Sequence, residues 1–133
     1  MEYVLGFLVG GSVSVFASLV GLDKERGFYA VVLIVIASYY VLFAAVGAST
    51  AIVATELSLM AAFVLVAIVG FKRNPWLLVA GLAGHAVFDL LHPHFVGNPG
   101  VPRWWPGFCL AYDLTAASYL AWLLRRRRAE HGA

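Results

Sequence analysis

The sequence contains few charged residues and a single cysteine, and both scarcities narrow what the protein can be. Only 12% of its 133 residues are charged, whereas 62% are hydrophobic. Soluble domains are about half apolar and about one quarter charged, so this composition excludes an ordinary soluble domain and indicates a membrane protein. One cysteine excludes an internal disulfide and any site built from several cysteines. We also expect no nucleic-acid partner.

Long apolar runs alternate with short polar or glycine- and proline-rich stretches. A membrane-spanning helix needs about 20 mostly apolar residues, and these runs lack the alternation typical of membrane strands. The first run, within MEYVLGFLVGG, also lacks the basic leader of a signal peptide, so we interpret it as a retained helix. The sequence therefore predicts one all-α domain, residues 1–133, built as a bundle of five transmembrane helices. The expected spans cover residues 3–22, 28–48, 50–70, 76–96 and 105–124.

The basic residues predict how this bundle is oriented. Arg103 alone falls on the side of the N-terminus. The others fall on the side of the C-terminus and are Lys24, Arg26, Lys72, Arg73 and Arg125 to Arg128. Because cytoplasmic loops are enriched in Lys and Arg, we expect the N-terminus outside and the C-terminus in the cytoplasm. The expected location is the bacterial inner membrane, where membrane lipids surround the bundle.

Three acidic residues lie inside expected spans, where charged groups cost at least a few kcal/mol each. These are Glu56, Asp89 and Asp113. At 1.5 Å per residue, all three lie roughly 9–12 Å below the outer surface. On the fourth span, His85 and His92 share a helix face with Asp89. The sequence therefore predicts a polar pocket that opens outward among spans three, four and five.

Imidazole and carboxylate groups are good ligands for zinc and for non-haem iron or manganese. We expect His85, Asp89 and His92 to be the metal ligands. Glu56 and Asp113 are the candidate catalytic residues, Glu56 as base or fourth ligand and Asp113 as a group that orients a ligand from behind. A metal with an open position activates water, so this interpretation predicts a metal-dependent hydrolase of a lipid or another apolar substrate.

Other interpretations remain open at this point. A proton or ion carrier would use similar residues, although the polar groups gather in the outer half rather than crossing the membrane. Haem binding is disfavoured because two histidines on one helix face cannot sandwich a haem. A structural hydrogen-bond network is the remaining alternative, with Tyr39, Tyr40 and Tyr112 as donors. Cys109, one turn before Asp113, is either a soft ligand or, as we favour, a packing residue.

Small residues recur at intervals of four in the first span. They are Gly6, Gly10, Ser14 and Ser18. Such a stripe lets another helix approach closely. We favour packing within one bundle, and a homo-oligomer interface is the alternative.

Two strings, GHAVFDLLHPH and VPRWWPGFCLAYDLTAASYL, together resemble an uncharacterised family of small bacterial multi-pass membrane proteins. That family pairs a His-xxx-Asp-xx-His helix with a Trp-rich loop and a Tyr-Asp pair, and the resemblance covers roughly the last third of the chain. It implies no activity, but it implies that certain residues act as one set: His85, Asp89, His92, Tyr112 and Asp113.

The chemistry is also similar to that of the membrane hydrolases that include alkaline ceramidases and adiponectin-type receptors. Those proteins place His, Asp and Ser around zinc within the membrane. This chain departs from them in its five spans, in Gly81 where a Ser is expected, and in the lack of a late His-xxx-His. The similarity concerns chemistry rather than ancestry.

Overall fold

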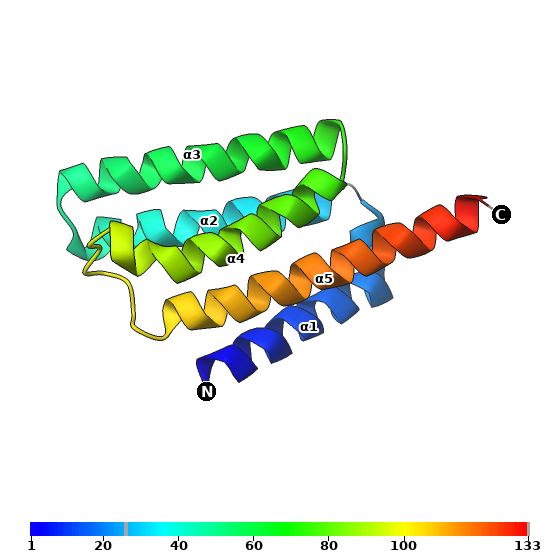
Figure 1. Cartoon of the computed structure of the whole chain (residues 1–133), viewed down its shortest axis with the longest axis horizontal. Coiled ribbons are helices and arrows are strands. Elements are labelled where there is room, and N and C mark those ends of the chain that lie inside the picture. Colours follow the sequence, from blue (N-terminus) through cyan, green and yellow to red (C-terminus); the bar gives the residue numbers. More distant parts are fainter. Residues whose placement is uncertain (26, 133) are drawn as a thin grey trace.

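A computed structural model gives the architecture and describes residues 1–25 and 27–132. Over these residues the chain forms five long helices and one short 3-10 helix, η1. Their bounds are α1 (Glu2–Val20), η1 (Leu22–Lys24), α2 (Gly27–Gly47), α3 (Thr50–Lys72), α4 (Trp76–Phe95) and α5 (Trp105–Gly132). The five long helices run alternately in opposite directions (Figure 1). Each is long and apolar enough to cross a membrane, which confirms the predicted all-α architecture of five candidate spans.

The fifth helix continues well beyond its predicted span. The apolar run ends near residue 124, but α5 reaches Gly132. Arg126 donates to Glu130 over 3.0 Å, an i,i+4 pair that stabilises helix in water. Hydropathy therefore located the end of the apolar segment, whereas the helix itself continues into a charged segment that local pairs stabilise.

Helix α4 lies in the middle of the bundle. It packs against α2, α3 and α5, while α1 packs against the far side of α5. Figure 1 shows α3 and α1 at opposite edges, with α4 and α5 crossing between them. Every polar side chain on the inward face of α4 therefore meets another helix rather than lipid.

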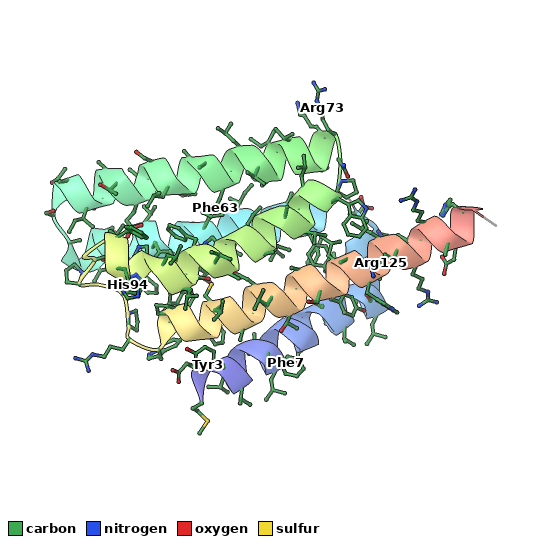
Figure 2. The ribbon with its side chains drawn as sticks, viewed as in Figure 1. Tyr3, Phe7, Phe63, Arg73, His94 and Arg125 are labelled. Carbon is green, nitrogen blue, oxygen red and sulfur yellow. The ribbon has the colours of Figure 1, made fainter. Side chains whose placement is uncertain are left out.

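The two ends of the bundle differ in charge. Arg73 and Arg125 extend from one end, whereas His94 lies at the other (Figure 2). Arg26, which we assigned to the basic end, lies outside the described residues. At the opposite end the α4–α5 loop closes against α2: a Cβ on Gly100 would lie 2.0 Å from the Phe43 carbonyl oxygen.

The small-residue stripe of α1 faces α5 of the same chain. A Cβ on Gly6 would lie 2.2 Å from the carbonyl oxygen of Phe108, and one on Gly10 would lie 3.0 Å from that of Tyr112. Only glycine permits this approach of two helix backbones. The structure therefore uses the stripe for packing within the bundle, and a homo-oligomer through it stays a prediction.

Candidate metal centre

The inward face of α4 carries polar residues at helical spacing. His85, Asp89 and His92 are 0%, 0% and 2% exposed, and they share this face with apolar residues such as Leu82. The shared face was predicted from the spacing of about 100° per residue. Proline does not interrupt it, because α4 continues through Pro93 to its last residue.

Four of the buried side chains form what we call the four-residue cluster: His85 and Asp89 from α4, and Cys109 and Asp113 from α5. One ligand atom from each lies within 4.8 Å of the others. All four residues are at most 1% exposed. Cys109 and Asp113 are one helical turn apart, so both point from α5 toward α4.

The centre of this cluster is the His85 imidazole. Its Nδ1 lies 2.6 Å from Asp113 Oδ2 and 3.3 Å from Asp89 Oδ2. The Cys109 sulfur lies 3.8 Å from both oxygens of Asp113. From α2, the Tyr40 hydroxyl donates to Asp89 Oδ1 over 2.7 Å. Each acid thus contacts His85 and one further side chain, Cys109 for Asp113 and Tyr40 for Asp89.

Some polar atoms of the cluster have no hydrogen-bond partner among the described residues. They are His85 Nε2 and Asp89 Oδ2, both buried. Phe63 and Phe88 flank the imidazole, with ring centroids 4.7 and 5.5 Å away. Buried polar groups are normally hydrogen-bonded, so these atoms have unused hydrogen-bonding capacity, and the one polar contact given for Asp89 Oδ2 is its 3.3 Å approach to His85 Nδ1.

Glu56 and His92 form a second polar group nearer the α4–α5 loop, here called the loop-side pair. His92 Nε2 lies 2.7 Å from Glu56 Oε1. Asn98, from the loop, donates to the same oxygen over 3.0 Å and to the Tyr40 carbonyl over 3.1 Å. The Tyr40 ring stacks on His92 with centroids 3.9 Å apart. Tyr40 therefore touches both polar groups.

The structure divides the residues predicted to form one site. It brings His85 and Asp89 together, as expected, but it adds Asp113 to them directly and pairs His92 with Glu56 instead. The reason is the two turns of α4 that separate the histidines. At the level of His85 the facing acid comes from α5, and at the level of His92 it comes from α3.

Two contributors were not selected from the sequence. Cys109 was assigned to packing, although its spacing of four from Asp113 placed both on one face of α5. Asn98 lies in the GNPG turn, where asparagine is common for local reasons, so the sequence carried no signal for it. Arg103, the basic residue predicted at the opposite end from the others, is exposed and lines a surface pocket.

Two openings approach the polar groups from different sides. A pocket of about 540 Å³, the loop pocket, is lined by His92, Asn98, Arg103 and prolines of the α4–α5 connection. A second space of about 430 Å³, the lateral cleft, is almost wholly apolar and lies between α1, α2 and α5, where it reaches Cys109. One opening thus meets the loop-side pair and the other meets the four-residue cluster.

Across the part of the chain that the structure describes, neither Lys nor Arg is buried. The four-residue cluster nevertheless contains two carboxyl groups, and isolated charges of this kind are very unfavourable in a low dielectric. The site must therefore contain protons on its acids and histidine, or a bound cation. It can hold a metal ion with one imidazole, two carboxylates and a thiol.

No protein-family model matches this chain, and no curated protein or solved structure is significantly similar to it. The resemblance to a family of small bacterial membrane proteins accordingly stays a prediction. The functional argument depends on the geometry of the site.

Proposed function

We propose that the protein is an intramembrane metal-binding protein that holds a divalent transition-metal ion in the four-residue cluster, with zinc as the first candidate. The observation that carries the proposal is the convergence of four ligand atoms from two helices within 4.8 Å. All four side chains are buried. Convergence of this kind is costly to build in a membrane unless the groups are used.

The spacing of the donor atoms supports a tetrahedral ion. Zinc bonds of about 2.0–2.3 Å place neighbouring ligand atoms about 3.3–3.8 Å apart. The His85–Asp89 separation of 3.3 Å and the Cys109–Asp113 separation of 3.8 Å fall in this range. The shorter His85–Asp113 contact of 2.6 Å is a hydrogen bond, which would lengthen when an ion takes the place of its proton.

Charge balance supports a divalent ion over a monovalent one. Two ionised carboxylates and a neutral imidazole carry a charge of −2, which one divalent cation cancels, and a bound Cys109 thiolate adds one negative charge that a divalent cation offsets better than a monovalent one. Without a cation, the same neutrality requires protons on His85 and on one of the two acids. The cluster can therefore replace the bound cation by two protons, and neither state needs a further charged residue. This agrees with the absence of buried Lys and Arg over residues 1–25 and 27–132.

We further propose that the α4–α5 loop lies on the outer side of the membrane. The basic end of the bundle, with Arg73 and Arg125, then faces the cytoplasm (Figure 2), as the bias of Lys and Arg toward cytoplasmic loops favours. In this orientation the loop pocket opens outward. Protease accessibility of tags placed at each end of the chain, measured in sealed vesicles, tests this orientation.

The direct test compares two histidines of α4 in full-length protein purified in detergent micelles. We expect stoichiometric zinc in the wild type, and cobalt absorption bands typical of a tetrahedral site with a sulfur ligand. His85→Ala should lose both. His94→Ala is the matched control, because His94 is exposed on the same helix, and it should keep both.

The contrary outcomes are distinct. Metal bound equally by wild type and His85→Ala would place it elsewhere and overturn the proposal. Wild-type protein that binds neither zinc nor cobalt would also overturn it. In that case a large loss of thermal stability in His85→Ala would support the alternative of a structural polar network.

A metal-dependent hydrolase is the second candidate, and the lateral cleft favours it. The cleft is apolar, opens toward lipid and reaches Cys109 of the cluster. A cluster with four protein ligands is closed, whereas catalysis needs an open position. If the Cys109 thiol stays unbound, that position faces the cleft, where an ester or amide of a lipid can enter.

In this candidate reaction a bound ion supplies Lewis-acid polarisation. Asp113 would accept a proton from water at the carboxylate oxygen that does not bind the ion, the water oxygen would bond to the substrate carbonyl carbon, and the bond to the alcohol or amine would break. Asp113 then returns the proton to the leaving group. Glu56 was predicted as the base, but it belongs to the loop-side pair, where it contacts His92. Asp113 is therefore better placed to act as the base.

Hydrolysis is tested by giving the zinc-loaded protein fluorogenic esters with long and short acyl chains. Activity that requires the long acyl chain and disappears when a chelator removes the zinc supports this candidate. Val35→Phe narrows the cleft and should lower long-chain turnover while zinc content is unchanged. Inactivity of the zinc-loaded wild type toward both esters would leave a non-catalytic metal protein, such as an ion carrier, as the function.

A further inference from the structure

We infer that Glu56, His92 and Asn98 form a transit site, which receives a divalent cation from the loop pocket and passes it to the four-residue cluster. This inference rests on the proposed function, because it concerns how the same ion reaches its ligands. It assigns the loop-side pair a role in the rate of binding rather than in the final coordination.

The four-residue cluster has no polar route to water on its other sides, because the lateral cleft that reaches Cys109 is almost wholly apolar. Its members are at most 1% exposed. Phe63 and Phe88 flank His85. Toward the basic end, the buried neighbours on α4 and α5 are apolar, and they include Leu82, Leu78, Ala116 and Leu120. A hydrated cation has no polar contact along that direction, so the favourable approach is from the α4–α5 loop.

The loop pocket supplies the space for such an approach. Its volume is about 540 Å³, and a cation with six waters needs roughly 180 Å³ at about 30 Å³ per water. His92 and Asn98 both line it, and both bind Glu56 just behind the wall. A cation that enters the pocket therefore meets an imidazole and an amide directly, with a carboxylate next to them.

Glu56 has unused capacity to bind a cation. Its Oε1 interacts with both His92 and Asn98, whereas its Oε2 is buried and has no hydrogen-bond partner among the described residues. The side chain is 1% exposed, so water does not solvate that oxygen. A carboxylate held in this way is an attractive first ligand for a cation that sheds its waters.

The loop-side pair offers fewer ligands than the cluster beyond it. It has one carboxylate, whereas the four-residue cluster has two together with a thiol. Affinity therefore rises along the route, as a transit site requires. Tyr40 connects the two groups, since its ring stacks on His92 at 3.9 Å and its hydroxyl donates to Asp89 over 2.7 Å.

The test measures the rate of cobalt uptake by the full-length protein with stopped-flow absorbance. Gly97 lines the loop pocket, and a Cβ there would meet nothing within 4 Å. Gly97→Phe therefore adds a phenyl group at the wall of the pocket, and its Cβ meets no atom of the fold. Gly11→Phe on α1 is the matched control, because a Cβ at Gly11 also meets nothing within 4 Å.

We expect Gly97→Phe to slow uptake about tenfold or more while the final cobalt stoichiometry and spectrum match the wild type, and Gly11→Phe to change neither. Glu56→Gln keeps the shape of the side chain but removes its charge, and should also slow uptake about tenfold, since a focused charge of opposite sign accelerates association by about 10–1000-fold. Release should slow with uptake, because removal of a transit site does not alter the end states.

Three results would overturn the inference. Uptake at the wild-type rate in both Gly97→Phe and Glu56→Gln would exclude this route. Loss of stoichiometric cobalt in Glu56→Gln would make Glu56 a ligand of the final site rather than a transit residue. Equal slowing in Gly97→Phe and Gly11→Phe would trace the effect to the added phenyl group alone. Wild-type protein that binds no cobalt instead defeats the proposed function itself, so the two failures are distinguishable.

Discussion

The two inward-facing histidines of α4 occupy contrasting surroundings although they lie on one helix face. His85 contacts two acids and lies near a thiol, inside a cluster closed by aromatic rings. His92 contacts one acid, stacks on Tyr40 and lines an open pocket. Two histidines on one helix face thus lie in different environments, one in a closed cluster and one beside an open pocket.

The contrast shows that the neighbouring helix, more than the motif, determines what a buried histidine can do. The acid at His85 comes from α5, and it brings Cys109 one turn away. The acid at His92 comes from α3, where the loop adds Asn98. A rich set of donors suits tight binding, and a sparse set beside an opening suits exchange. Four variants test this division, each directed at one side of it.

The largest effect is expected for Asp113→Asn. This change removes a charged ligand from the four-residue cluster and leaves an unbalanced site, so zinc content should fall to background. Loss of an outer-shell group alone costs about 10–100-fold in affinity, and loss of a ligand costs more. Elemental analysis of purified protein measures it. Asp23→Asn, a buried carboxyl near the basic end, is the control and should retain zinc.

Glu56→Ala should spare zinc binding but destabilise the fold. It leaves His92 buried without its partner, and breaking a buried pair costs about 3–5 kcal/mol. Denaturant titration in mixed micelles measures the free energy of unfolding. Glu130→Ala removes an exposed pair with Arg126 and should cost no more than about 1 kcal/mol. Equal losses in the two variants would contradict a buried ion pair at Glu56.

Tyr40→Phe removes the contact of Tyr40 with the four-residue cluster but keeps its contact with the loop-side pair, and it removes no ligand. The ring remains available to stack on His92, but Asp89 loses the hydroxyl that fixes its orientation. Zinc affinity should fall about 10–100-fold, as for other outer-shell groups, with no loss of stoichiometry at saturation. Competition with a chelator of known affinity measures it. Tyr39→Phe, the adjacent tyrosine, should bind as the wild type does.

The smallest effect is expected for Cys109→Ser, which replaces the softest donor by a harder one of similar shape. Affinity should fall only modestly, because the Ser hydroxyl keeps a donor atom at this position and the other three ligands remain. The sulfur-to-cobalt charge-transfer band in the near-ultraviolet should vanish while the tetrahedral bands persist. Absence of this band from the wild type would show that Cys109 is not a ligand, which would favour the open position that hydrolysis needs.

The helices were predictable because each depends on one local quantity, the run of apolar residues. The shared face of His85, Asp89 and His92 followed from helical periodicity in the same way. The partner of each histidine was not predictable, since it depends on which helix lies alongside α4 at that level. Asn98 was missed for a related reason, because a loop contact with the Tyr40 carbonyl has no periodic signature.

The contact of Gly6 with the Phe108 carbonyl joins the first helix of the bundle to the fifth, and this imposes an order on biosynthesis. Translation adds about 5–20 residues per second, so α1 resides in the bilayer for several seconds before α5 emerges. During that time its glycine-lined surface lacks the helix that it packs against in the folded chain. The bundle is therefore complete only after α5 has been synthesised.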